Sequence, residues 1–137
     1  EDIAQTNRLG TKLNPNFEKL FHIEKLPESE NILTIKEKNK LIGFIHYSRI
    51  YECLEIQNII VDKMWKNKGY ASKLLNALIT KNKDAQKIIL EVNENNIEAI
   101  NFYQKHKFIE INRRPKYYKT GDAIIMEKVL WKKMYIF

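Results

Sequence analysis

The stretch "MWKNKGYASKLLNALI", residues Met64–Ile79, has the pattern of a helix that begins at Gly69. Its apolar residues recur at the spacing of one helical face, at Ala71, Leu74, Leu75 and Leu78. Helices usually begin with a capping Ser, Thr, Asp or Asn and with acidic residues in the first turn, because the exposed N–H groups and the helix dipole make that end positive. This helix instead follows Lys66-Asn67-Lys68, which contains two cations and no acid. The pattern raises the question of which negative group belongs at this end.

The turn before this helix has the features of an anion site. Gly69 is one of only four glycines, and the turn follows an apolar stretch, residues 53–61, that reads as a strand. A strand, a short turn with converging N–H groups and a helix start with nearby lysines can bind a phosphate or pyrophosphate. The alternative, an ordinary helix start with solvated lysines, stays open on this stretch alone. The P-loop and Rossmann glycine patterns are absent.

Length and composition predict one folded domain over residues 1–137, since 44% of the residues are hydrophobic and 30% are charged. No apolar run reaches the ~20 residues of a membrane span, and the start does not resemble a signal peptide, which favours a cytoplasmic protein. A single cysteine, Cys53, excludes an internal disulfide, and we expect no metal because the three histidines are scattered. Whether residues precede Glu1 stays open.

The net charge of +7 allows two interpretations. Lysines and arginines keep many proteins soluble, and they also attract the phosphates of RNA, of a nucleotide or of a nucleotide-bearing cofactor. Charge alone does not choose between them.

The order of elements predicts an α+β fold, with a mixed, mostly antiparallel sheet and flanking helices. A short helix is expected over residues 17–25, ended by Pro27, and another over 95–106. Strands are expected over residues 31–36, 41–51, 53–61, 87–92, 108–113 and 123–129. The last two strands would form a long hairpin around a loop at residues 117–122.

Three motifs in this order resemble those of the GNAT superfamily of acetyl-CoA-dependent N-acyltransferases. Residues 66–71 resemble its Q/R-x-x-G-x-G/A signature, and "LEVNENNIEAINFYQKHKF", Leu90–Phe108, resembles its L-E-V-x-x-x-N-x-x-A-x-x-x-Y-x-x-x-G-F stretch. "RPKYYKTGDAIIM", Arg114–Met126, resembles the ending of one branch, the bacterial ribosomal-protein alanine N-acetyltransferases. Lys66 replaces the usual Gln or Arg of the signature, and Lys107 replaces the Gly before the Phe.

The resemblance implies a single GNAT-like domain with a splayed central strand pair and acetyl-CoA as the acetyl donor. In such enzymes the backbone of the turn binds the pyrophosphate, here the N–H groups of Asn67, Lys68, Gly69, Tyr70, Ala71 and Ser72. The pantetheine arm would pair with the backbone of Ile59, Ile60 and Val61, whose side chains we expect in the core. Asn96 would bond the pantetheine, although it could equally cap the second helix.

The resemblance also assigns the chemistry. Glu91 interrupts an apolar strand, and it would accept the proton of an amine whose pKa is ~8 before that amine attacks the thioester directly in a ternary complex. Tyr103 would donate a proton to the departing thiolate. Asn96 and Tyr103 lie two helical turns apart and are expected on one inward face. The alternative for Tyr103 is a core residue.

Arg114, Tyr117 and Tyr118 would line the acceptor site from the hairpin loop, unless they are exposed residues of an ordinary turn. By the same resemblance, residues 1–30 would form a variable acceptor-side segment, and the tail, residues 130–137, would cover an apolar face or bridge two subunits. The expected acceptor is a protein N-terminal α-amine, of the kind presented by a small-subunit ribosomal protein. Alternatives are a small-molecule amine or lysine side chain and, third, a non-catalytic RNA- or ribosome-binding module. A monomer or weak dimer is expected, with no membrane or direct nucleic-acid partner.

Overall fold

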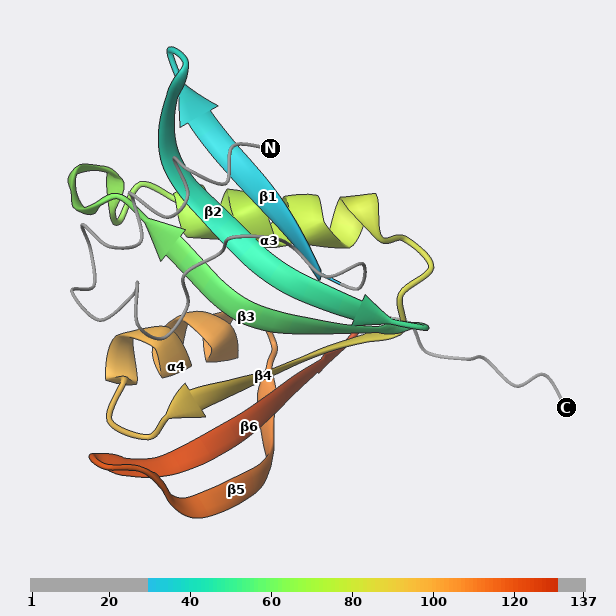
Figure 1. Cartoon of the computed structure of the whole chain (residues 1–137), viewed down its shortest axis with the longest axis vertical. Coiled ribbons are helices and arrows are strands. Elements are labelled where there is room, and N and C mark those ends of the chain that lie inside the picture. Colours follow the sequence, from blue (N-terminus) through green and yellow to red (C-terminus); the bar gives the residue numbers. More distant parts are fainter. Residues whose placement is uncertain (1–29, 131–137) are drawn as a thin grey trace, which may run out of the picture. The chain divides into compact units, whose positions relative to one another are not determined.

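The computed structural model describes residues 30–130 of the chain, which contain six strands, two α-helices and one short 3-10 helix. The strands form a mixed sheet in the order β1-β2-β3-β4-β6-β5, confirming the predicted α+β fold (Figure 1). The elements are β1 (Glu30–Glu37), β2 (Lys40–Ile50), β3 (Cys53–Val61), η1 (Lys63–Trp65), α3 (Tyr70–Lys81), β4 (Lys87–Asn93), α4 (Ile97–Lys105), β5 (Ile109–Tyr118) and β6 (Gly121–Val129).

The described residues group into two compact units, residues 30–49 with 57–83 and residues 50–56 with 84–130. The division falls inside β3, and each unit is described by itself. The expectation of a single domain over 1–137 stays a prediction.

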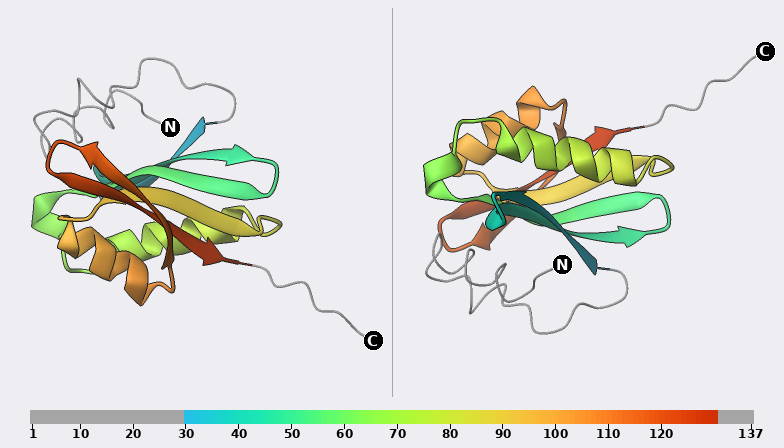
Figure 2. Two further views of the ribbon diagram at one scale, coloured as in Figure 1. Left: turned by 90° about the horizontal axis from the view of Figure 1, so that it is seen from below. Right: turned by 90° about the horizontal axis from the view of Figure 1, so that it is seen from above.

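In the first unit, β1 and β2 form an antiparallel hairpin whose turn uses two residues with positive φ, Lys38 and Asn39. Helix α3 lies on one face of this hairpin (Figures 1 and 2). The close approach depends on Gly43, because a Cβ there would lie 2.9 Å from the Ile60 carbonyl oxygen and 3.3 Å from Leu74 Cδ1. The apolar face predicted from the sequence is buried through Leu74, Leu75 and Leu78.

In the second unit, β4 pairs in parallel with β3 over Cys53–Ile56 and antiparallel with β6, which pairs antiparallel with β5. Side chains of β4 alternate between buried and half-buried positions, as a strand requires. Its buried positions belong to a core that includes Leu54, Ile56, Ile88, Leu90, Val92, Tyr103, Phe108, Ala123, Ile124 and Met126.

Helix α4 ends in a Schellman motif at the position where the family usually has glycine. Lys107 adopts φ 72°, its N–H donates to Gln104 O at 3.0 Å, and the Phe108 N–H donates to Tyr103 O at 3.0 Å. Lys128 Nζ also donates to His106 O at 2.7 Å, at the negative end of the helix. The turn is therefore kept with a lysine in the left-handed conformation.

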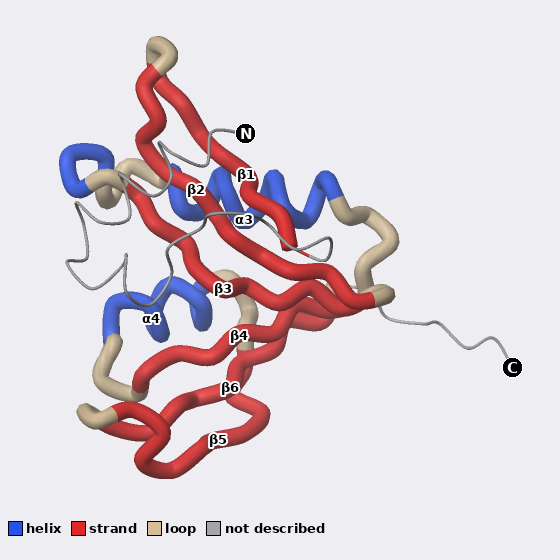
Figure 3. Tube along the Cα trace, in the orientation of Figure 1, coloured by secondary structure: helices blue, strands red, loops and turns tan. Residues whose placement is uncertain are grey.

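The predicted strands and both predicted helices of the described region are confirmed, but the expected hairpin loop at residues 117–122 is wrong. Strand β5 runs to Tyr118 and β6 begins at Gly121, so only a short turn separates them (Figure 3). Arg114, Tyr117 and Tyr118 are thus strand residues. Pro115, which lacks an N–H group, and an irregular register between Arg114 and Tyr118 hid the strand from pattern reasoning.

The helix expected over residues 17–25 lies outside the described residues, and so do residues 1–29 of the expected acceptor-side segment 1–30 and residues 131–137 of the expected tail 130–137. Within the described part of the chain, no helix is long and apolar enough to cross a membrane.

Candidate functional site

The turn that precedes α3 presents an uncapped helix N-terminus. Gly69 occupies the N-cap position at φ 84°, ψ 8°, in the left-handed region, and Asn67 also has positive φ, 61°. No side-chain hydrogen bond caps α3 and no acid lies in its first turn, whereas Asp62 does cap the preceding η1 by accepting from the Met64 N–H at 3.1 Å. The chain therefore supplies a cap to η1 and leaves the α3 end suited to an external anion.

Cations and aromatic rings surround this turn. The Tyr70 hydroxyl donates to Glu37 Oε1 at 3.0 Å, which raises the pKa of Tyr70 and anchors the helix start to the β1–β2 turn. Lys68 Nζ lies 5.4 Å from the centre of the Trp65 ring, and Lys73 Nζ lies 4.8 Å from the centre of the Tyr70 ring. Two ammonium groups thus lie over aromatic rings of residues that flank the helix start, so the residues present fit a pyrophosphate.

The end of β3 contains the residues expected to pair with pantetheine. Val61 is buried as predicted, but Ile59 and Ile60 are only half-buried, so the expectation that all three side chains lie in the core holds for Val61 alone. Asn58, in the same strand, was not predicted as a site residue. Its Nδ2 atom is buried and has no hydrogen-bond partner among the described residues, and a lone Asn in a strand gives no signal of that state.

In the second unit, four predicted site residues lie together. Glu91, whose side chain is 29% exposed, forms an ion pair with Arg114, with Oε1 and Nη2 3.3 Å apart. The Arg114 guanidinium lies 5.5 Å from the centre of the Tyr117 ring, and the Tyr117 and Tyr118 rings meet edge to face at 5.1 Å. Burial, followed by the charge of Glu91, raises the pKa of Tyr118, so its hydroxyl stays protonated near the carboxylate at neutral pH.

Asn96 and Tyr103 do not share an inward face as expected. Asn96 is exposed and caps α4, its Oδ1 accepting from the Ala99 N–H at 3.1 Å, so only its Nδ2 group is left to donate to a ligand. Tyr103 is 6% exposed and packs against Phe102 and Phe108. Capping positions the Asn96 side chain on the helix start rather than on the apolar stripe.

Burial raises the pKa of Tyr103, because its phenolate would lose solvation. Its hydroxyl is therefore protonated at neutral pH. This state suits the predicted role, and the packing also fits the alternative of a core residue.

Cys53, the single cysteine of the chain, is partly buried and forms no disulfide. Burial raises the pKa of the Cys53 thiol, as expected for a small residue in a strand rather than a nucleophile. Among the described residues, no group of three or more His, Cys, Asp or Glu side chains is arranged to hold a metal ion.

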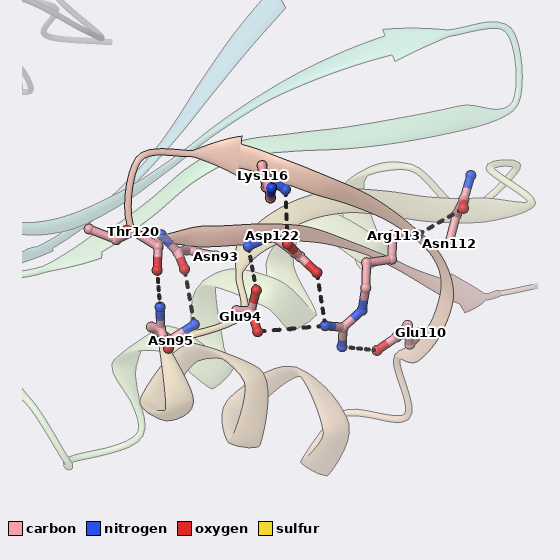
Figure 4. A network of polar contacts seen from close by, with 9 residues as sticks. All are labelled: Asn93, Glu94, Asn95, Glu110, Asn112, Arg113, Lys116, Thr120 and Asp122. Carbon is pink, nitrogen blue, oxygen red and sulfur yellow. Dashed lines mark hydrogen bonds and ion pairs between the residues drawn. The ribbon is translucent and has the colours of Figure 1, made fainter.

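A polar network around Asp122 was missed by the sequence analysis (Figure 4). Arg113 Nη1 lies 3.4 Å from Asp122 Oδ2 and 3.6 Å from Glu94 Oε1, while its Nη2 lies 3.4 Å from Glu110 Oε1. The carboxylates of Glu94 and Asp122 are 28 residues apart in sequence, so no local sequence pattern predicts that they lie together.

The similarity of this sequence to known proteins identifies its family. The sequence matches the Acetyltransferase (GNAT) family over residues 2–108, and the chain belongs to this family. It is an acetyl-CoA-dependent N-acetyltransferase, as the resemblance implied.

Its particular relatives include alanine N-acetyltransferases of ribosomal proteins. The chain is 28% identical over 132 residues to the ribosomal protein bS18-alanine N-acetyltransferase of Haemophilus ducreyi, covering 84% of this chain and 91% of that protein. The crystal structure of the ribosomal-protein-S18-alanine N-acetyltransferase from Escherichia coli matches with a TM-score of 0.79 and 21% identity, covering 98% of this chain and 94% of that one.

A solved aminoglycoside 6'-N-acetyltransferase in complex with coenzyme A also matches, with a TM-score of 0.81, 14% identity and coverage of 97% of this chain and 93% of that one. At these identities the two solved structures establish the fold alone. They confirm the predicted fold class and not the acceptor.

Proposed function

We propose that this enzyme acetylates the N-terminal α-amine of a protein, of the ribosomal-protein alanine type. The observation that carries the proposal is the cluster of Glu91 with Arg114, Tyr117 and Tyr118. It combines an acid for the amine with aromatic walls and a cation that suit the first residues of a peptide. The near full-length similarity to the Haemophilus ducreyi enzyme supports the same acceptor class.

Acetyl-CoA, when bound, supplies the thioester whose acetyl group is transferred. The backbone N–H groups of Asn67–Ser72 bind its pyrophosphate, helped by the uncapped end of α3 and by Lys68. The backbone of Ile59–Val61 pairs with the amides of the pantetheine arm, and Asn96 donates from Nδ2. Backbone groups make most of these proposed contacts with acetyl-CoA. Its binding should therefore tolerate side-chain substitutions more readily than changes of backbone conformation.

Glu91 accepts the proton that the acceptor ammonium must lose before its nitrogen can attack. The Arg114 guanidinium holds one carboxylate oxygen of Glu91 at 3.3 Å and so orients the other. Tyr103 donates a proton to the sulfur that departs as the new C–N bond forms. The base and the acid are thus separate side chains, and the transfer needs no covalent bond to the enzyme.

Tyr117 and Tyr118 wall the acceptor, and the exposed Tyr117 ring is available to pack on it. A protein acceptor would be a newly made ribosomal protein, which places the reaction in the cytoplasm.

A second candidate is a small-molecule amine, the acceptor class of the aminoglycoside 6'-N-acetyltransferase whose fold this chain shares. A deep acidic site is typical of enzymes for polycationic amines. Among the described residues, the charge of Glu91 is balanced by Arg114, which favours a peptide over a polycation. The RNA-binding module loses its basis, since family membership already explains the anion site.

Calorimetric titration with acetyl-CoA and with coenzyme A is the first test, followed by acetyl transfer to a panel of amines. We expect saturable binding of both nucleotides and transfer to a peptide with N-terminal alanine. The controls are the same peptide with a blocked N-terminus, a peptide with an internal lysine, spermidine and kanamycin. Binding of acetyl-CoA with transfer only to spermidine or kanamycin would replace the proposed acceptor by the second candidate. Transfer to none of them, with acetyl-CoA bound, would refute both.

A further inference from the structure

The pairing of β5 with β6 becomes irregular between Arg114 and Tyr118, the residues proposed to line the acceptor site. Arg114 pairs with Ala123 and Tyr118 pairs with Gly121, so β5 advances four residues while β6 advances two. The two extra residues bulge outward, with Lys116 in the left-handed region at φ 53°. A bulge of this kind leaves a backbone N–H group without a partner on the neighbouring strand.

Asp122 supplies the missing partner. Its Oδ1 accepts from the Lys116 N–H at 2.9 Å, and its Oδ2 lies 3.4 Å from Arg113 Nη1. The first of these contacts is the main cause of a lowered pKa of Asp122. A side chain from β6 thus closes the gap in the ladder and fixes the backbone between Arg114 and Tyr117.

Asp122 is itself held from the other side by the loop that follows β4. The Asp122 N–H donates to the Glu94 carboxylate, and the Glu94 N–H donates to Asp122 O at 3.0 Å. Gly121 allows this approach, because a Cβ there would lie 2.8 Å from Asn95 Nδ2 and 2.9 Å from Glu94 Cγ. The loop begins three residues after Glu91, so the network connects the base-bearing strand with the bulge (Figure 4).

We propose that Asp122 is a positioning residue that sets acceptor affinity by holding the β5 bulge, and with it Arg114, Tyr117 and Tyr118, at Glu91. This inference rests on the proposed function. The ion pairs of Arg113 are largely exposed, and such pairs contribute little to stability. The essential contact is therefore the hydrogen bond from the Lys116 N–H, which needs an oxygen at the right distance rather than a charge.

Three variants separate geometry from charge. Asp122→Asn keeps an oxygen for the Lys116 N–H and loses the charge. Asp122→Glu keeps the charge and displaces the oxygen, and Asp122→Ala removes both. The measurements are the KM for the alanine peptide, kcat, the Kd for acetyl-CoA, and amide hydrogen exchange of Lys116 by NMR without ligands.

We expect Asp122→Ala and Asp122→Glu to raise the acceptor KM about ten-fold, the order expected when one ordering hydrogen bond is lost. Exchange at Lys116 should accelerate in both, while the Kd for acetyl-CoA stays within about two-fold of wild type. Asp122→Asn should resemble wild type in KM and exchange. If Asp122→Ala does not fold, the Asn and Glu variants alone still decide.

An unchanged acceptor KM despite faster Lys116 exchange would overturn the proposal, and so would an Asn variant as impaired as the Glu variant. Failure of wild type to acetylate any amine would refute the proposed function instead. In that case the exchange data would still show whether Asp122 holds the bulge.

Discussion

Replacing Gly69 with alanine tests how strongly the turn before α3, the proposed pyrophosphate site, depends on its backbone conformation. Gly69 has φ 84°, and a Cβ added there would meet nothing within 4 Å. The substitution therefore adds no clash, and its cost is conformational. An L-residue in the left-handed region costs about 1–2 kcal/mol, of which the reduced entropy of the unfolded chain returns about 0.4–1. The expected net cost is about 1 kcal/mol.

This cost divides between stability and binding. If the turn keeps its conformation, the unfolding free energy falls by the full amount and the Kd for acetyl-CoA is unchanged. If the turn relaxes, stability falls less and binding weakens, because the ligand must restore the left-handed turn. Urea unfolding and calorimetric titration measure the two parts, and their sum should be about 1 kcal/mol.

Gly69→Asn is the matched control, since asparagine tolerates this region better than alanine and should lose less. A sum near zero for Gly69→Ala would show that the left-handed turn is not required. A sum above about 3 kcal/mol would exceed conformational strain and point to a contact with the added methyl group. Either result would refute the reasoning.

Lys107→Gly should raise the unfolding free energy by about 0.5–1 kcal/mol in urea unfolding, because it relieves a lysine at φ 72°; no gain would show that the Schellman turn carries no strain. Glu91→Gln should lower kcat/KM by at least about 100-fold at pH 7, and the deficit should shrink about ten-fold by pH 9, where an α-amine with pKa ~8 deprotonates by itself. A deficit independent of pH would exclude the base role. The control is Glu98→Gln, which removes the charge of an exposed acid in the first turn of α4. Tyr103→Phe should slow kcat without changing the Kd for acetyl-CoA. Burial raises the pKa of folded Tyr103 above its unfolded value, so wild-type stability should fall as the pH rises above about 10, and urea unfolding of the Phe variant should show a smaller fall.

The fold was largely predictable because its elements carry local signals. The α3 face has helical spacing, the turn at Lys38-Asn39 separates two β-rich runs, and β4 is a short apolar strand. The exception is the end of β5, where Pro115 and the bulge break the alternation that marks a strand. Irregular pairing depends on the partner strand, so the sequence of one strand alone does not predict it.

The geometry of the candidate site was only partly predictable from the sequence. Glu91, Arg114, Tyr117 and Tyr118 were named from motifs, and the structure brings them together. Sequence reasoning placed Asn96 on an inward face, because helical periodicity takes no account of capping. Long-range polar contacts, such as those of Asp122, have no periodicity at all.

The pairing of the arginines shows why residue type alone was insufficient. Arg113 and Arg114 are neighbours, and Glu91 and Glu94 are three residues apart, so the sequence allows either pairing. Successive strand residues face opposite sides of a sheet, and the register places Arg114 beside Ala123 and, through it, on the face of Asn93 and Glu91. Arg113 faces the other side, where it meets Glu94. One acid therefore lies beside the tyrosines and the other is bound into the hairpin, a difference that the strand register creates. For Arg113 to pair with Glu91 in place of Arg114, β5 would have to shift by one residue along β6. The hydrogen bond from the Lys116 N–H to Asp122 opposes this shift.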